Sequence, residues 1–175
     1  MATMILLPDG SNNESLDWII VGAGSIQNAL MFDDGTTAYV KCDDTGERMG
    51  IEFANPSVLE ADITSIDSVR FLSSGKSTDR LSTTRIALEF YVPSGNATEN
   101  AVYAAHRTNF TTINGTARQY SDGSSAVWTY ANLQDLELRV TMASSIEVYL
   151  SYLALEVTYT PAVSADNATF FGANF

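Results

Sequence analysis

Cysteine and long apolar runs are both scarce in this chain of 175 residues. The single cysteine, Cys42, excludes an intrachain disulfide, and the neighbouring Asp43 and Asp44 are expected to raise the pKa of its thiol. No apolar run approaches the roughly 20 residues that a membrane span needs. Residues 1–9 lack the basic start and the full-length apolar core of a signal peptide. We therefore expect a soluble protein that is made in a cytoplasm and has no membrane partner.

Basic residues are few. Nine Lys and Arg stand against 21 Asp and Glu, so the formal net charge is −12. Binding to a phosphate backbone draws on clustered Lys and Arg, which this chain lacks, so we expect no nucleic-acid partner. A strongly acidic exterior suits a protein that is displayed at high density, because mutual repulsion resists clumping.

Residues that carry catalysis are also rare. His106 is the one histidine, and nothing near it in the strand-like residues 100–108 marks a nucleophile for it to activate. A glycosidase needs only two carboxylates, but no pair stands out among the 21 acids. Residues 19–27 resemble the glycine-rich opening of a dinucleotide-binding fold, yet Gln27 stands where glycine or alanine is needed and the alternating helices are missing. The sequence therefore predicts neither an enzyme nor a cofactor.

The chain does have the two-residue repeat of β-strands. Apolar residues alternate with others in residues 49–53, 85–92 and 136–142, which puts one face of each strand on a core. Long helical stripes are absent, and we expect at most one turn of helix, near residues 131–135. In the last strand the apolar phase slips by one residue, which predicts a β-bulge or bend at Ser151 and Tyr152. Pro161 is expected to end that strand, because proline cannot donate to a ladder.

Turn residues recur at short spacing between these runs. Asn114 and Gly115 predict a two-residue hairpin turn between the segments on either side of them. No internal repeat or linker divides the chain. The sequence thus predicts one all-β domain over residues 16–160, an antiparallel β-sandwich of the jelly-roll kind with about eight to ten strands.

The two ends, residues 1–15 and 161–175, are polar and small, and we interpret them as an N-terminal and a C-terminal arm. Each carries apolar anchors, which free tails usually lack. The anchors are Ile5, Leu6 and Leu7 in front and Phe170, Phe171 and Phe175 behind. Two interpretations stay open: they cover the edges of the sandwich itself, or they dock on a neighbouring subunit.

Two further possibilities concern ligands. A structural cation is an alternative to solvated turn acids at Asp33, Asp34, Asp43 and Asp44, because hard cations prefer several oxygen ligands. Aromatic residues are plentiful, with two Trp, eight Tyr and eight Phe, and we expect Trp18 and Trp128 in the core. If two or more other rings were exposed together in a groove, they would suit a carbohydrate-binding module for host adhesion.

Several segments together resemble a group of jelly-roll-like virion proteins of tailed bacteriophages. The most distinctive are Asp-Gly-Thr-x-x-Tyr-Val at residues 34–40 and Glu-Val-Thr-Tyr at residues 156–159. The others are Trp18, Gly22 and residues 29–30; Phe53 to Pro56; Ile66, Val69 and Phe71; Trp128, Thr129, Leu133, Leu136 and Leu138; and residues 148–149. Residues 96–126 match nothing in this group.

The resemblance implies a structural virion protein with no catalytic residues. It favours a capsid decoration (cement) protein on the outside of the head, with a tail or baseplate component as an alternative. The partners would be the major capsid protein or other virion proteins, together with sister copies in a homo-oligomer such as a trimer. The protein would be located in the virion, assembled in the host cytoplasm, and the anchors of the two arms would supply its contacts.

Overall fold

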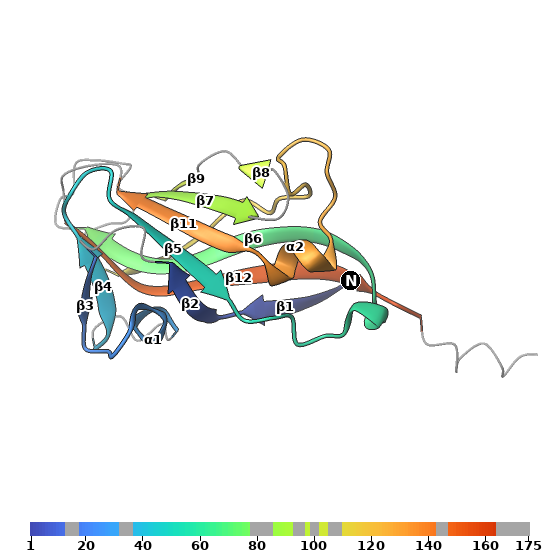
Figure 1. Ribbon diagram of the computed structural model, residues 1–175, viewed down its shortest axis with the longest axis horizontal. Coiled ribbons are helices and arrows are strands. Elements are labelled where there is room, and N and C mark those ends of the chain that lie inside the picture. The colour runs from blue at the N-terminus through green and yellow to red at the C-terminus, as the bar shows by residue number, and fades with distance from the viewer. Residues whose placement is uncertain are drawn as a thin grey trace, which may run out of the picture.

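The computed structural model of the chain is a sandwich of two antiparallel β-sheets (Figure 1). It describes residues 1–12, 18–31, 37–77, 86–92, 97–98, 102–104, 110–142 and 147–163. Twelve strands occur among these residues, six in each sheet.

The first sheet is built around two long neighbouring strands. Its order is β10 (Thr111–Asn114), β6 (Ile63–Ser77), β12 (Val148–Pro161), β4 (Tyr39–Cys42) and β3 (Ile19–Val21), and β1 (Ala2–Leu6) also pairs with β12. All of these pairs are antiparallel. Because β4 pairs with residues 148–150 and β1 with residues 155–159, both lie along the same side of β12.

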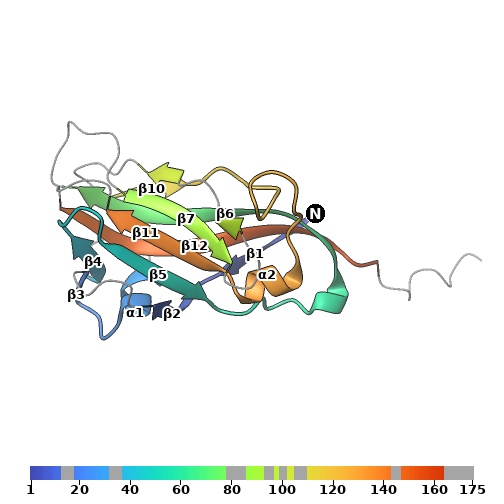
Figure 2. The same cartoon turned by 45° about the horizontal axis from the view of Figure 1, so that its top comes forward.

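The second sheet covers the first. Its order is β2 (Pro8–Asn12), β5 (Arg48–Phe53), β11 (Glu137–Met142), β7 (Ile86–Val92) and β8 (Ala97–Thr98), and β9 (Val102–Ala104) also pairs with β7. In Figures 1 and 2, β5 and β11 cross over β12 and β6 of the first sheet. The chain passes repeatedly from one sheet to the other, as in Greek-key and jelly-roll sandwiches. The predicted antiparallel β-sandwich is confirmed.

The core lies between the two sheets because alternate side chains of each strand point inward. In β7 every second residue, beginning with Ile86, is buried, as its sequence pattern predicts. Phe71 of β6 contacts Phe90 of β7 across the sandwich with ring centroids 6.5 Å apart, and Phe90 meets Trp128 edge-on at 6.0 Å. The indole N–H of Trp128 donates to the carbonyl of Arg118 at 2.9 Å. Trp18 and Trp128 are both buried, as predicted.

The predicted bulge in the last strand is confirmed. The register of β12 against β6 shifts between Leu150 and Tyr152, so Ser151 is the extra residue. Leu150 and Leu153 are both buried on the inner face, whereas Tyr149 and Tyr152 are both half-buried on the outer face. The strand ends at Pro161, as predicted.

Three short helical segments complete the fold. The expected turn near residues 131–135 is helix α2 (Tyr130–Gln134), and a 3-10 turn, η1, spans Glu60–Asp62. The expectation of a single helical turn was wrong, because α1 (Ile26–Leu30) follows β3 and is capped by the side chain of Ser25, which accepts a hydrogen bond from the backbone N–H of Asn28. α1 lies beside β3 and β4 at one end of the sandwich, and α2 and η1 lie toward the other end (Figure 1). No helix in the described part of the chain has the length and apolar character that a membrane crossing requires.

The predicted hairpin at Asn114 and Gly115 was wrong. Asn114 is the last residue of β10, which pairs with β6 and not with the segment that follows it. The N–H of Gly115 donates to the carbonyl of Phe71 at 2.8 Å, and a Cβ at this position would lie 2.4 Å from the Phe71 ring. Glycine is therefore needed here for close approach to a neighbouring strand and not for a tight turn.

The front end of the chain is part of the sandwich over its described length. Residues 2–6 form β1 in the first sheet and residues 8–12 form β2 in the second. At the other end, β12 includes Pro161, residues 162–163 are exposed after it, and the rest of the predicted C-terminal arm lies outside the described residues.

Candidate functional site

Three neighbouring strands place a row of large side chains on the outer face of the first sheet. Tyr149 of β12 pairs with Lys41 of β4 on one side and with Lys76 of β6 on the other. Directly opposed residues of antiparallel strands share a face. The neighbours of these three residues in each strand are buried, so the row itself points away from the core. β10 extends the row, because Phe110 directly precedes that strand on the far side of Lys76.

Three aromatic rings meet in this row. Tyr39, two residues before Lys41, contacts Tyr149 in an edge-on arrangement with centroids 5.3 Å apart. The ring of Tyr39 also lies 6.5 Å from that of Phe110. All three residues are half-buried, so part of each side chain reaches the surface. The rings therefore form one contiguous aromatic surface drawn from three segments far apart in the chain.

Two ammonium groups lie against these rings. The Nζ of Lys76 is 4.8 Å from the ring centroid of Phe110 and 4.7 Å from that of Tyr149. The Nζ of Lys41 is 6.0 Å from the centroid of Tyr149. Cations at such distances are attracted by the negative faces of the rings. The two lysines therefore flank the central tyrosine.

Glu147 links Lys41 and Tyr149. One carboxylate oxygen of Glu147 accepts from the ammonium of Lys41 at 2.7 Å, and the other accepts from the hydroxyl of Tyr149. The hydrogen bonds from Lys41 and then Tyr149 lower the pKa of Glu147, and the same contacts raise the pKa of Lys41 and of Tyr149. At neutral pH the three groups are thus held as a carboxylate, an ammonium and a neutral phenol. We call Tyr39, Lys41, Lys76, Phe110, Glu147 and Tyr149 the aromatic–lysine patch.

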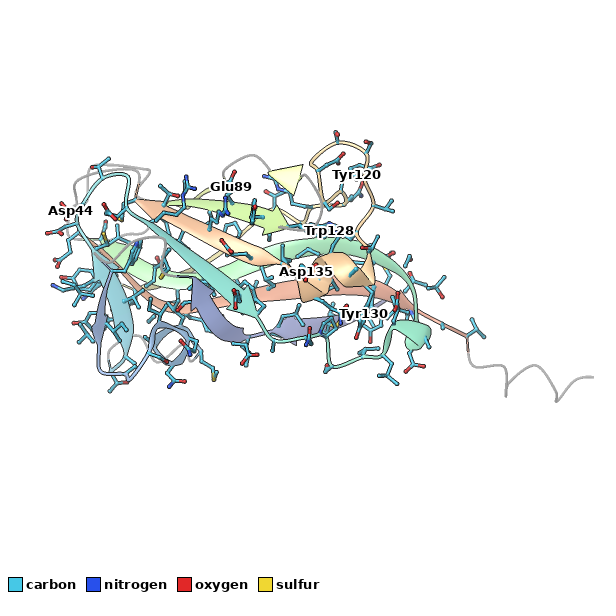
Figure 3. The ribbon with its side chains drawn as sticks, in the orientation of Figure 1. Asp44, Glu89, Tyr120, Trp128, Tyr130 and Asp135 are labelled. Atoms are coloured by element: carbon cyan, nitrogen blue, oxygen red, sulfur yellow. The ribbon has the colours of Figure 1, made fainter. Side chains whose placement is uncertain are left out.

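A polar cleft of about 340 Å³ lies at the second sheet, between the start of β2, the end of β5 and the start of β11. Four acids, Asp9, Glu52, Asp135 and Glu137, and the amides Asn55 and Gln134 line it. Figure 3 shows Asp135 beside α2. The ring among its lining residues, that of Phe53, is buried. The cleft can offer hydrogen bonds, but it has no aromatic surface on which a sugar ring could pack.

The carboxylate of Glu137 is not free within this cleft. It is buried and forms an ion pair with Arg139, whose Nε lies 3.0 Å from a carboxylate oxygen. The guanidinium carbon of Arg139 lies 3.3 Å from the ring centroid of Tyr91 in the neighbouring strand. Glu137 is therefore already paired with Arg139, and this ion pair belongs to the outer face of the second sheet.

No family model matches the chain, and no curated protein matches it either. Solved structures do resemble it. The C-terminal CBM6 of LamC, a marine laminarinase from Zobellia galactanivorans, matches with a TM-score of 0.47 and 10% identity over 90% of this chain and 99% of that one. CBM29_1, a family 29 carbohydrate binding module from Piromyces equi, matches with a TM-score of 0.45 and 12% identity over 89% and 91%. The carbohydrate binding module CBM6cm-2 from Cellvibrio mixtus lichenase 5A, solved with cellotriose, matches with a TM-score of 0.45 and 10% identity over 89% and 97%.

The predicted anchors of the N-terminal arm are divided between core and surface. Leu6 is 2% exposed and belongs to the core, and Leu7 is half-buried. Ile5, in contrast, is 45% exposed on the outer face of the first sheet. The other predicted anchors, Phe170, Phe171 and Phe175, lie outside the described residues. The part that these residues play in binding a partner stays a prediction.

Only two of the four acids considered as cation ligands lie within the described residues. Asp33 and Asp34 lie outside the described residues, whereas Asp43 and Asp44 are exposed in the turn after β4. Among the described residues, no three His, Cys, Asp or Glu side chains come together as metal ligands. Figure 3 shows Asp44 at the end of the sandwich away from Tyr120 and Tyr130.

Cys42 is buried, and its pKa is raised as expected. Burial of the thiol is the main cause of this shift, and the adjacent acids contribute less than the sequence suggested.

Sequence reasoning missed the aromatic–lysine patch. Its members come from four segments, and the register that joins them is not visible in any one segment. One partial signal was present: Lys41 stands two positions after Tyr39, so the two side chains are expected on the same face of one strand.

Proposed function

We propose that the protein binds carbohydrate through the aromatic–lysine patch. The observation that carries this proposal is the contiguous surface of Tyr39, Phe110 and Tyr149 on one sheet face, with the two lysines beside it. A sugar ring has apolar C–H faces, which pack on aromatic rings, and a rim of hydroxyl groups, which need hydrogen-bond partners. The patch offers both kinds of contact side by side.

The direction of the patch suits a chain of sugars. It runs across the strands from Lys41 through Tyr149 and Lys76 to Phe110. Strands lie about 4.8 Å apart, so three steps span about 14 Å. An oligosaccharide that lies perpendicular to β12 would meet Tyr149 about one third of the way along this span. Its hydroxyl groups would then lie within reach of the ammonium groups and of Glu147.

The test is the binding of soluble oligosaccharides and polysaccharides, measured by affinity electrophoresis and then by calorimetry. The wild-type chain should bind at least one of them, and Tyr149→Ala and Phe110→Ala should each weaken that binding by more than about tenfold, because stacking on an aromatic ring is lost. Tyr120→Ala is the matched control. Tyr120 is 38% exposed and lies on the loop before α2, away from the patch (Figure 3), so its loss should change binding less than twofold.

Two results would refute the proposal: no binding by the wild type to any member of a broad glycan panel, or equal binding by the Tyr149→Ala variant. The melting temperature of each variant shows whether it is folded. Tyr149→Phe, which keeps the ring and removes only the hydroxyl that donates to Glu147, separates stacking from hydrogen bonding.

A structural role in a virion is a second proposal. Its ground is the sequence resemblance, and one structural feature suits it: Ile19 and Ile20 on β3 and Ile5 on β1 are exposed on strands that pair on one side only within the described sheet. Exposed apolar residues on an open edge suit contact with a neighbouring subunit. Quantitative mass spectrometry of particles purified from the source would test it, and absence of the chain from such particles would refute it.

A further inference from the structure

The two lysines of the chain converge on one tyrosine. Lys41 and Lys76 are 35 residues apart in sequence, and the register of β4, β12 and β6 places one on each side of Tyr149. The protein carries a net charge of −12, so positive charge is scarce on its surface. Both lysines are nevertheless at the surface that we propose for carbohydrate.

The two ammonium groups are not equivalent. Lys41 is held by the carboxylate of Glu147 at 2.7 Å. Lys76 lies over two rings, Phe110 and Tyr149, and within the described residues no carboxylate lies within ion-pair distance of it. The rings attract the charge of Lys76, and among the described residues no acceptor atom engages the three N–H donors of its ammonium.

An ammonium held in this way is suited to a negatively charged group. The two rings attract the ammonium and hold it beside Tyr149. Each charge-assisted hydrogen bond to an oxyanion is stronger than one to a neutral hydroxyl. A sugar ring that packs on Tyr149 would bring a substituent on its edge next to Lys76, because the ammonium is 4.7 Å from the centroid of that ring.

The net negative charge of the protein repels an anionic ligand at the patch only weakly. At physiological ionic strength the Debye length is about 8 Å, so acids elsewhere on the surface are largely screened from a ligand at the patch. The acid within the patch, Glu147, already has Lys41 and Tyr149 as partners.

We infer that the ligand is an anionic sugar chain, whose carboxylate or sulfate group binds the ammonium of Lys76 while the sugar ring packs on Tyr149 and Phe110. This inference rests on the proposed carbohydrate-binding function. It adds the chemical class of the ligand and assigns its charged group to one residue.

The experiment compares pairs of oligosaccharides that differ only in charge. One pair is oligogalacturonate and its methyl ester, and the other is a sulfated galactan oligomer and its desulfated form. The wild type should bind the charged member of at least one pair about tenfold more tightly, and the preference should shrink as salt is raised. Which pair responds distinguishes a carboxylate ligand from a sulfate ligand.

Variants then assign the preference to Lys76. Lys76→Gln should abolish it, so that the charged and the neutral member of the pair bind equally tightly. Lys76→Arg should retain most of it. Arg70→Gln is the matched control, because Arg70 is a cation of β6 on the same sheet face, but it is paired with Glu156 at 2.8 Å and lies outside the patch. This variant should keep the preference.

The failures are distinguishable. If the wild type binds the neutral member of both pairs as tightly as the charged one, or if Lys76→Gln keeps the preference, the inference is refuted and the proposed function stands. If neither these ligands nor any glycan of the broad panel binds, the proposed function is refuted and the inference fails with it.

Discussion

Replacing Phe90 by alanine tests the contact between the two sheets. Phe90 is 1% exposed and lies between Phe71 of the opposite sheet and Trp128. Phe→Ala in a core costs about 3–5 kcal/mol, from lost burial and from the cavity that remains. Each aromatic pair adds about 0.5–1.5 kcal/mol to simple burial, so we expect a loss in the upper part of that range, about 4–5 kcal/mol. For a domain of this size the melting temperature should then fall by about 8–20 °C.

The assay is urea unfolding at equilibrium, followed by near-ultraviolet circular dichroism so that the environment of Trp128 is recorded together with stability. The slope of the unfolding free energy against urea should stay constant, because the variant changes stability and not the surface exposed on unfolding. Phe90→Leu is the control: it keeps most of the buried apolar volume and loses only the ring contacts, so it should cost about 1–2 kcal/mol. A loss below about 1 kcal/mol for Phe90→Ala, with an unchanged near-ultraviolet spectrum, would refute the contact.

Single residues elsewhere in the fold lead to three more predictions. Gly22→Ala should lower the urea midpoint far more than Gly24→Ala, because a Cβ at Gly22 (φ +74°) would lie 1.7 Å from a backbone carbonyl oxygen and nothing lies within 4 Å at Gly24; equal midpoints would contradict this. Three backbone N–H groups, of which that of Ser125 has the largest effect, donate to Oδ1 of Asp122 at 2.8–2.9 Å. These hydrogen bonds lower the folded-state pKa of Asp122. Its contribution to stability is therefore present above the unfolded pKa of about 3.9 and is lost as pH falls through the folded pKa. The stability difference between wild type and Asp122→Asn should shrink below about pH 4, and a constant difference down to pH 2 would count against the reasoning. Cys42, 2% exposed and with a pKa raised by burial, should react with a thiol reagent only when the domain opens, and rapid labelling of the native protein at neutral pH would disprove this.

Local patterns were sufficient to predict much of the fold. Alternation of apolar and polar residues identified β5, β7 and β11, and the slip in phase located the bulge at Ser151. These features depend on which face of a strand is buried, and that is recorded residue by residue in the sequence.

Features that depend on approach between distant segments were missed or misread. Gly115 looks like a hairpin residue. Its position needs glycine because a Cβ there would collide with the ring of Phe71, more than 40 positions earlier. For Leu6 the sequence left two interpretations open, and the pairing of β1 with β12, which buries this side chain, is what favours cover of the sandwich itself. α1 is only five residues long, too short to show a helical stripe.

The candidate site was missed for the same reason, because it too depends on contacts between segments that are far apart in the chain. Lys41, Lys76 and Tyr149 are unremarkable within their own strands, and only the pairing of β4, β12 and β6 brings them together. A sequence pattern can predict that each side chain faces outward, but not which other side chains it faces across a sheet.

The position of β12 also determines when the fold can be completed. β12 pairs with β1, β4 and β6, and β1 has no other partner in the described sheets. During synthesis, β1 therefore emerges early and must wait, unpaired, until residues 148–161 have left the ribosome. The first sheet, and with it the surface around Tyr149, is assembled only after translation of β12, through contacts that close loops of more than 100 residues. Such long-range pairing is slow, so the apolar residues of β1 that the folded protein buries, Met4 and Leu6, stay accessible to other chains throughout that interval.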